Sequence, residues 1–229
     1  MMRFRDRADA GRRLATMLLP YRGSDARVLG VARGGLRVAY EVARALEVPL
    51  DVWVSRRLSI PGRALTLGAV SEGGGQYLLS DSLRLAPLPR SEVDSLVSEE
   101  ASVVEEQVRR LRGRPPPELG GRTVLLVDDG VLTGATAAAA LRALRLLHPA
   151  RLVMGTPVAS PQGLEVLRRE ADAVACVSTE AGMRSVAEAY DDFRAFPDVE
   201  LQNLVERSRQ PPWRSQAVLE STDPGGSWM

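Results

Sequence analysis

The sequence contains no lysine, so each of its 30 basic residues is an arginine. Without a lysine amine, the chain cannot form a Schiff base and cannot supply the lysine of a P-loop. Kinases and ATPases of the P-loop type are therefore excluded. A guanidinium group stays protonated at neutral pH, so we expect the arginines to bind anions and not to act as bases.

Cysteine and histidine are nearly absent, with one of each at Cys176 and His148. A single thiol excludes an internal disulfide and is typical of a reducing compartment, which predicts a cytoplasmic protein. His148 precedes Pro149 at an expected helix end, where we interpret it as structural. No apolar run reaches the roughly 18–20 residues of a membrane span. The 30 basic and 29 acidic residues give a net charge of +1, so neither a membrane nor a nucleic acid is expected as a partner.

The chain of 229 residues is long enough for one α/β domain. We expect that domain at residues 1–208 and a disordered tail, rich in proline, serine and glycine, at residues 209–229. Apolar runs and helical periodicity alternate along the domain, which predicts a parallel sheet covered by helices on both faces. The expected strands are 28–31, 49–54, 123–127, 151–155 and 174–177, and the expected helices are 6–19, 36–46, 91–111, 135–147, 161–170 and 198–208.

Two segments before the long helix are harder to interpret. Residues 55–68 are expected to form a mobile or extended loop, and residues 69–70 and 77–79 are expected to pair as a hairpin. The helix at 91–111 carries an apolar stripe, which favours packing on the sheet; a dimer seam is the alternative.

The most informative motif covers residues 124–136 and is VLLVDDGVLTGAT. Its four apolar residues predict a short buried strand that ends at Asp128 and Asp129. A turn of small residues then leads into a helix, and turn amides at a helix N-terminus are suited to a phosphate. Thr133 and Thr136 can donate two further hydrogen bonds, and the carboxylates suit the two hydroxyls of a ribose diol. An ordinary strand end would explain one Asp and the glycine, but not the second carboxylate with two threonines.

This motif resembles the PRPP (5-phosphoribosyl-1-pyrophosphate) signature of type I phosphoribosyltransferases. The resemblance extends over most of residues 3–196. The segments FRDRADAGRRL at 4–14 and VLGVARGG at 28–35 are similar to a bacterial branch described only as predicted phosphoribosyltransferases. The resemblance implies an α/β fold with a helix-flanked parallel sheet and a small C-terminal hood.

A second anion-binding turn is expected at residues 30–35, GVARGG. Gly34 and Gly35 let the backbone approach a ligand closely, and Arg33 adds a fixed positive charge. A Rossmann dinucleotide site is disfavoured because the spacing is G-x-x-x-G-G, and because the acid about 20 residues on, Asp51, lies near the start of its strand and does not end it. In the resembled family the equivalent turn binds the pyrophosphate of PRPP, sometimes through a non-proline cis peptide.

The resemblance implies a Mg²⁺-dependent enzyme that transfers the phosphoribosyl group of PRPP to a nitrogen acceptor and releases pyrophosphate. The acceptor would be a nucleobase or a related heterocycle. Mg²⁺ would be held mainly by PRPP oxygens, with Asp128 or Asp129 as candidate protein ligands. These two residues are also the catalytic candidates. The candidate substrate-binding residues are Arg33, Gly34, Gly35, Arg56, Arg57, Gly130, Val131, Leu132, Thr133, Gly134, Ala135 and Thr136. The alternative for Arg56 and Arg57 is that both are solvated arginines of a loop and bind no substrate.

The sequence departs from the family at two positions that concern the acceptor. In 6-oxopurine phosphoribosyltransferases the third residue after the acidic pair is often an Asp that handles a proton of the base. Here that residue is Leu132, which cannot transfer a proton. Residues 181–190, AGMRSVAEAY, replace the Pro-Phe and aromatic pattern that relatives often carry in the hood. The sequence therefore leaves the acceptor undetermined.

Two other classes of protein compete with the enzyme. A non-catalytic sensor of PRPP or nucleotides would keep the fold, but such regulators tend to add a basic nucleic-acid-binding face that is missing here. A receiver domain is excluded because its acidic pair follows the first strand, whereas this pair falls past the midpoint of the chain. The sequence is compatible with a homodimer.

Overall fold

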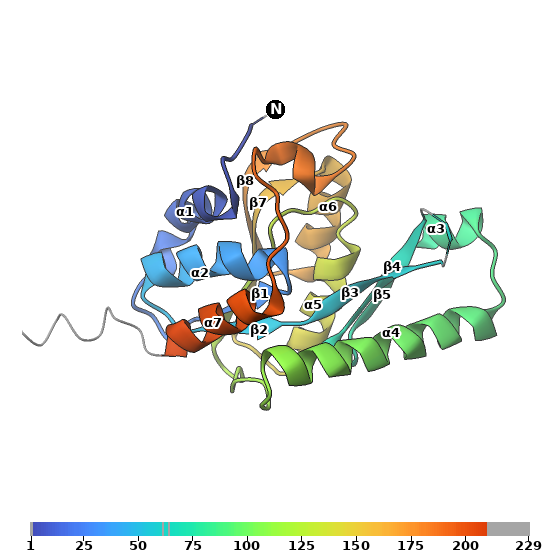
Figure 1. Ribbon diagram of the computed structural model, residues 1–229, viewed down its shortest axis with the longest axis horizontal. Helices are drawn as coiled ribbons and strands as arrows, with labels where there is room; N and C mark the ends of the chain where they lie inside the picture. Colours follow the sequence, from blue (N-terminus) through green and yellow to red (C-terminus); the bar gives the residue numbers. More distant parts are fainter. Residues whose placement is uncertain (1, 61, 64, 210–229) are drawn as a thin grey trace, which may run out of the picture.

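The computed structural model describes residues 2–60, 62–63 and 65–209, and Figure 1 shows their arrangement. Apart from Arg209, the expected tail at 209–229 lies outside the described residues. The central sheet has five parallel strands in the order β2-β1-β6-β7-β8. Their bounds are β1 Arg27–Val31, β2 Leu50–Trp53, β6 Thr123–Val127, β7 Arg151–Ala159 and β8 Ala173–Thr179. The predicted α/β fold with a parallel sheet is confirmed.

Helices cover both faces of this sheet. On one face lie α1 (Arg7–Leu18), α2 (Gly34–Leu46) and α7 (Asp198–Arg209), and on the other lie α5 (Ala135–Arg145) and α6 (Pro161–Glu170). Because side chains alternate along a strand, Leu125 and Val127 of β6 pack towards α1 and α2, and Val124 and Leu126 pack towards α5 and α6. A central parallel strand is thus apolar along its whole length, as its sequence indicated.

The segment expected to be a loop at 55–68 contains strands, so that prediction is wrong at both ends. β3 (Ser55–Ser59), β4 (Thr66–Ser71) and β5 (Gln76–Leu78) form a separate antiparallel sheet, and the predicted hairpin is its β4–β5 part. Leu58 and Leu67 are fully buried. The arginines at 56 and 57 interrupt the apolar pattern of β3 and had hidden the strand. The short helix η2 (Glu72–Gly74) joins β4 to β5.

The small sheet and two helices project from the body (Figure 1). The helices are α3 (Ser80–Leu85) and α4 (Arg90–Leu111), and α4 starts one residue before the expected Ser91. The stripe of α4 packs mainly on β3 and β4 and so covers the small sheet, while its Val104 and Leu111 join the core cluster that also contains Val52 of β2. After α4, the buried guanidinium of Arg112 donates to the Glu72 carboxylate at 2.5 Å, which fixes the base of this projection.

Residues 180–197 form the small C-terminal hood. They contain the helix η3 (Val186–Ala189) and cross above the carboxyl ends of the central strands. The N-terminal segment joins the hood through a bridge between Phe4 and Tyr190, and the short helix η1 (Leu19–Tyr21) extends α1. In the described part of the chain, no helix is both long and apolar enough to cross a membrane.

Candidate functional site

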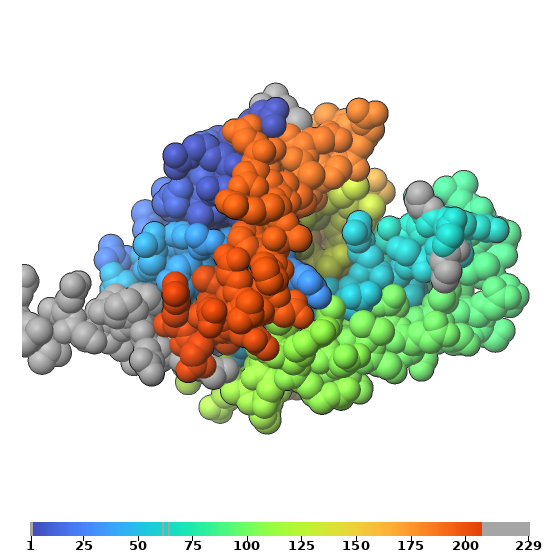
Figure 2. Space-filling view, in the orientation of Figure 1, coloured from blue at the N-terminus to red at the C-terminus, as the bar shows by residue number. Residues whose placement is uncertain are grey.

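The main functional candidate is a cleft at the carboxyl ends of β1 and β6. It encloses about 380 Å³, and Figure 2 shows the hollow between the orange hood and the cyan strands of the small sheet. Carboxyl ends of parallel strands are where ligands bind in open α/β sheets. Most of the predicted site residues line this cleft, namely Arg33, Gly34, Arg57, Asp128, Asp129, Gly130, Val131, Leu132, Thr133, Gly134, Ala135 and Thr136.

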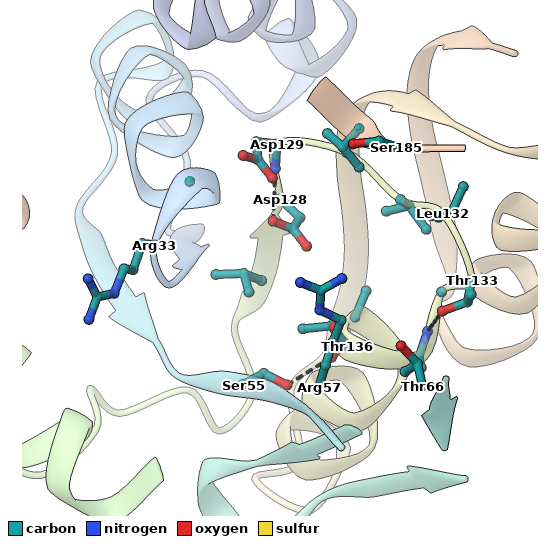
Figure 3. Close-up of a pocket in the computed structure, with 18 of the residues that line it drawn as sticks. Arg33, Ser55, Arg57, Thr66, Asp128, Asp129, Leu132, Thr133, Thr136 and Ser185 are labelled. Atoms are coloured by element: carbon teal, nitrogen blue, oxygen red, sulfur yellow. Dashed lines mark hydrogen bonds between the residues drawn. The ribbon is translucent and has the colours of Figure 1, made fainter. Parts of the chain in front are cut away.

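The two carboxylates after β6 have different surroundings (Figure 3). Asp128 points into the cleft, and one of its oxygens accepts a hydrogen bond from the Asp129 amide at 2.9 Å. The Asp129 carboxylate turns away from the cleft, and its Oδ2 accepts from Nε of Arg7 at 2.7 Å. The side chains of this ion pair are only 8% (Arg7) and 13% (Asp129) exposed. Asp128 is therefore the carboxylate available to a ligand.

The electrostatics of the pair follow from this arrangement. Burial raises the pKa of Asp128 well above its ordinary value, and the nearby charge of Asp129 raises it further. Arg7 opposes both effects. A ligand that donates hydrogen bonds to Asp128, or a cation beside it, would favour the ionised form.

The glycines of the turn at 30–35 allow α2 to begin against the acidic pair. A Cβ on Gly34 would lie 1.9 Å from Oδ2 of Asp129, and a Cβ on Gly35 would lie 2.7 Å from the carbonyl oxygen of Val127. Gly35 packs under the cleft and does not line it. The peptide bond between Ala32 and Arg33 is cis, as the family resemblance implied.

The expected phosphate loop leads directly into α5. Gly134 precedes the first helical residue with φ 80°, a left-handed conformation that glycine adopts without steric cost. The first amides of a helix have no intrahelical acceptor and can bind an anion. In α5 the Ala135 amide donates to the Thr133 oxygen at 3.4 Å, which leaves the Thr133 O–H free to donate and the next amides of the first turn to face a ligand.

The three predicted arginines take different positions. Arg57 faces the cleft from β3, whereas Arg56 points to α4, where its Nε donates to Glu100 at 2.6 Å. Adjacent residues of a strand face opposite sides, so both could not enter the cleft, and the placement of Arg56 there is corrected. Arg33 lies at the cleft edge with its guanidinium directed away, 3.2 Å from Asp198 Oδ1 on α7.

Several cleft residues were missed by the sequence analysis. Ser55 and Thr66 face the cleft from β3 and β4, and Ser55 donates a hydrogen bond to the carbonyl of Thr136 at 3.0 Å. These two were hidden by the loop prediction. Phe193 lines the hood side. The sequence does contain a signal for Arg7, because it occupies the first position of the helical stripe that continues with Ala10, Leu14 and Leu18. In the structure Arg7 is buried like these three residues.

The hood closes the end of the cleft beyond the acidic pair. Arg184, Ser185 and Val186 line it, and Val186 packs in the same apolar cluster as Leu132. The Val186 side chain packs so closely on Gly130 that a Cβ there would lie 2.3 Å from Val186 Cγ1. This end is therefore mostly apolar, with the Arg184 guanidinium at its rim.

The donor set of the cleft suits a hard cation that brings its own ligands. Among the described residues, no cluster of three or more His, Cys, Asp or Glu side chains is placed to hold a metal ion. The Asp128 carboxylate is nonetheless directed into the cleft. Mg²⁺ is commonly bound through one or two carboxylates together with substrate phosphates, so Mg²⁺ with a polyphosphate ligand fits these residues.

Comparisons with known proteins show what this chain is similar to. No family model matches the chain. Proteins of two Mycobacterium tuberculosis strains, CDC 1551 / Oshkosh and ATCC 25618 / H37Rv, both named "Putative phosphoribosyl transferase", are 34% identical over 226 residues, 98% of this chain. The chain spans about half of their length, 51%. The crystal structure of TT1426 from Thermus thermophilus is 39% identical and superposes with a TM-score of 0.71 over 89% of this chain and 98% of that one. Over almost its whole length, and with its acidic-pair motif in the cleft, the chain is similar to proteins named as putative phosphoribosyl transferases.

Proposed function

We propose that the protein is a Mg²⁺-dependent phosphoribosyltransferase that binds PRPP and transfers its phosphoribosyl group to a nitrogen acceptor. One observation carries the proposal. Asp128 faces the same cleft as the start of α5 and as the glycine turn before α2, so a sugar site lies between two anion sites. PRPP has this order of groups, with a diol between a 5′-phosphate and a pyrophosphate.

Each part of the cleft has a role in this proposal. Residues 130–136 hold the 5′-phosphate through their amides and the hydroxyls of Thr133 and Thr136. Asp128 accepts hydrogen bonds from the ribose hydroxyls, while the turn at Arg33 and Gly34, together with Arg57, holds the pyrophosphate. The acceptor lies under the hood beside Leu132. Its nitrogen displaces pyrophosphate from C1 of the ribose through an oxocarbenium-like transition state, which the nearby carboxylate stabilises electrostatically.

Mg²⁺, when bound with PRPP, would neutralise charge on the departing pyrophosphate. Asp128 is the residue that would hold it. The arginines of the cleft stay protonated at neutral pH, so they orient and stabilise anions and take no part in proton transfer.

Calorimetric titration with PRPP, with and without Mg²⁺, tests the proposal. We expect saturable micromolar binding that depends on Mg²⁺, followed by pyrophosphate release when a panel of bases is added. Binding without release for any base would favour the sensor alternative. A folded protein that binds no PRPP would overturn the proposal.

Thr133→Val is expected to weaken binding of ribose 5-phosphate and of PRPP by the same factor. The substitution removes one hydrogen bond to the shared phosphate, and a bond to a charged group contributes about 1.5–3 kcal/mol, or about 10-fold or more in affinity. Titration of both ligands checks this result. Thr16→Val on the exposed side of α1 is the control. Loss of PRPP affinity alone would place Thr133 at the pyrophosphate end.

Asp198→Asn is expected to raise the affinity for PRPP. Asp198 holds Arg33 at 3.2 Å on the side away from the cleft, and the asparagine would release the guanidinium towards the pyrophosphate. Because Arg33 is half exposed, the gain is limited to about 1 kcal/mol, or about fivefold. Ribose 5-phosphate affinity should not change, and Asp191→Asn, which removes an exposed partner of Arg3, is the matched control. Equal PRPP affinity in both variants would contradict the expectation.

A further inference from the structure

Arg7 connects three parts of the molecule that are distant in sequence. It is the first residue of α1, yet its Nε donates to Asp129 at 2.7 Å and its Nη1 donates to the carbonyl of Arg194 at 2.9 Å. Its guanidinium carbon lies 3.8 Å from the ring centre of Phe193 and 5.5 Å from that of Phe196. A cation stacked on aromatic rings and bonded to a carboxylate is held in one orientation.

The same contacts give the two residues of the acidic pair different roles. Two adjacent carboxylates repel each other, and both would repel a polyanionic ligand. Arg7 supplies the charge that balances Asp129 and holds it out of the cleft, while Asp128 keeps its direction into the cleft (Figure 3). One net negative charge therefore faces the ligand in place of two.

Arg7 also contacts the part of the hood that lines the cleft. Phe193 lines the cleft and stacks on Arg7, and the Tyr190 hydroxyl donates to the carbonyl oxygen of Asp129 at 2.5 Å. Burial raises the pKa of this phenol, so it stays a donor. The acidic pair and the hood are thus tied together at Arg7 and Tyr190.

We propose that Arg7 is a positioning residue of the cleft, which neutralises Asp129 so that Asp128 alone meets the sugar and which fixes Phe193 over the acceptor end. The ligand part of this inference rests on the proposed binding of PRPP. The tethering part does not, so the two are tested separately.

Hydrogen exchange of the free protein tests the tether. In Arg7→Met, the amides of residues 190–196 are expected to exchange at least about 10-fold faster than in the wild type, while those of α6 are unchanged. Arg7→Lys keeps the charge but lacks the planar fork, so exchange should rise there as well. Arg5→Met, on a side chain that is 74% exposed, is the control and should leave the exchange unchanged. Unaltered exchange at 190–196 in the folded Arg7 variants would overturn the tether.

Titration with Mg²⁺-PRPP tests the charge balance. Arg7→Met is expected to lower the affinity at least about 10-fold, because Asp129 is left as a second anion near the ligand. Adding Asp129→Asn to Arg7→Met should return most of that affinity, which a purely structural role for Arg7 would not do. A double variant that binds no better than Arg7→Met would overturn this part. A wild-type protein that binds no PRPP would overturn the proposed function instead, and the exchange experiment would still decide the role of Arg7 as a tether.

Discussion

Replacing Asp128 with asparagine is expected to lower the affinity for Mg²⁺-PRPP about 100-fold or more, with no loss of thermal stability. Each hydrogen bond from a ribose hydroxyl to the charged carboxylate contributes about 1.5–3 kcal/mol, and two such bonds correspond to about 100-fold or more in affinity. Stability should be kept because an asparagine oxygen can still accept from the Asp129 amide, and because repulsion between the two carboxylates is removed.

Titration calorimetry with a thermal unfolding scan of the same sample measures both expected effects. Asp25→Asn, which changes an exposed carboxylate paired with Arg122, is the matched control and should bind normally. The double variant Asp128→Asn with Asp129→Asn should also lose binding. Retained affinity in both acidic-pair variants would sink the assignment of the ribose diol to this pair.

Gly35→Ala is expected to destabilise the protein by about 1–3 kcal/mol, the usual range for overpacking a filled site. The new Cβ would lie 2.7 Å from the Val127 carbonyl oxygen and 2.8 Å from Cα of Asp128. Both atoms belong to the backbone of the central strand end, so α2 would have to move away from β6. The better helix propensity of alanine, up to about 1 kcal/mol, offsets only part of this cost.

Urea unfolding monitored by circular dichroism measures the change in the free energy of unfolding. Gly120→Ala is the control, because the nearest atom that a Cβ would meet there is the carbonyl oxygen of Leu147, at 3.7 Å. Equal unfolding midpoints for the two variants would show that α2 can move aside without loss. The close packing of the turn on the acidic pair would then contribute nothing to the free energy of unfolding.

The central sheet and the cleft loops could be predicted because their signals are local. β6 is an uninterrupted apolar run that ends in charged and small residues, and glycines follow β1 where α2 approaches the acidic pair. β3 could not be predicted in the same way. Two of its five residues are Arg56 and Arg57, which give it no apolar run, and its pairing with β4 depends on residues that the sequence places beyond a turn.

The inequality of Asp128 and Asp129 could not be predicted from the motif. It depends on Arg7, which lies 122 residues away and reaches the pair only when α1 packs on the sheet. The same holds for Asp198, whose pairing with Arg33 arises from the packing of α7 on α2. Sequence reasoning identified the residues that face a ligand, but the partners that orient them are set by tertiary packing.

The bridge between Phe4 and Tyr190 has a consequence for synthesis on the ribosome. Both glycine-rich loops and the acidic pair have been translated by residue 136, and the sheet is complete at Thr179. At that point Phe4 still lacks its bridge partner, and Arg7 still lacks the carbonyl and the rings that hold its guanidinium, because these belong to residues 189–196. Ala10 and Val158 can already pack with Phe4, but its ring lacks the hood residues Met183, Ala189 and Tyr190 of the same apolar cluster until nearly the whole domain has emerged. The packing of the hood on the amino-terminal segment is thus the final step of cleft assembly. A chaperone that binds this segment before residues 189–196 have emerged would act on that step.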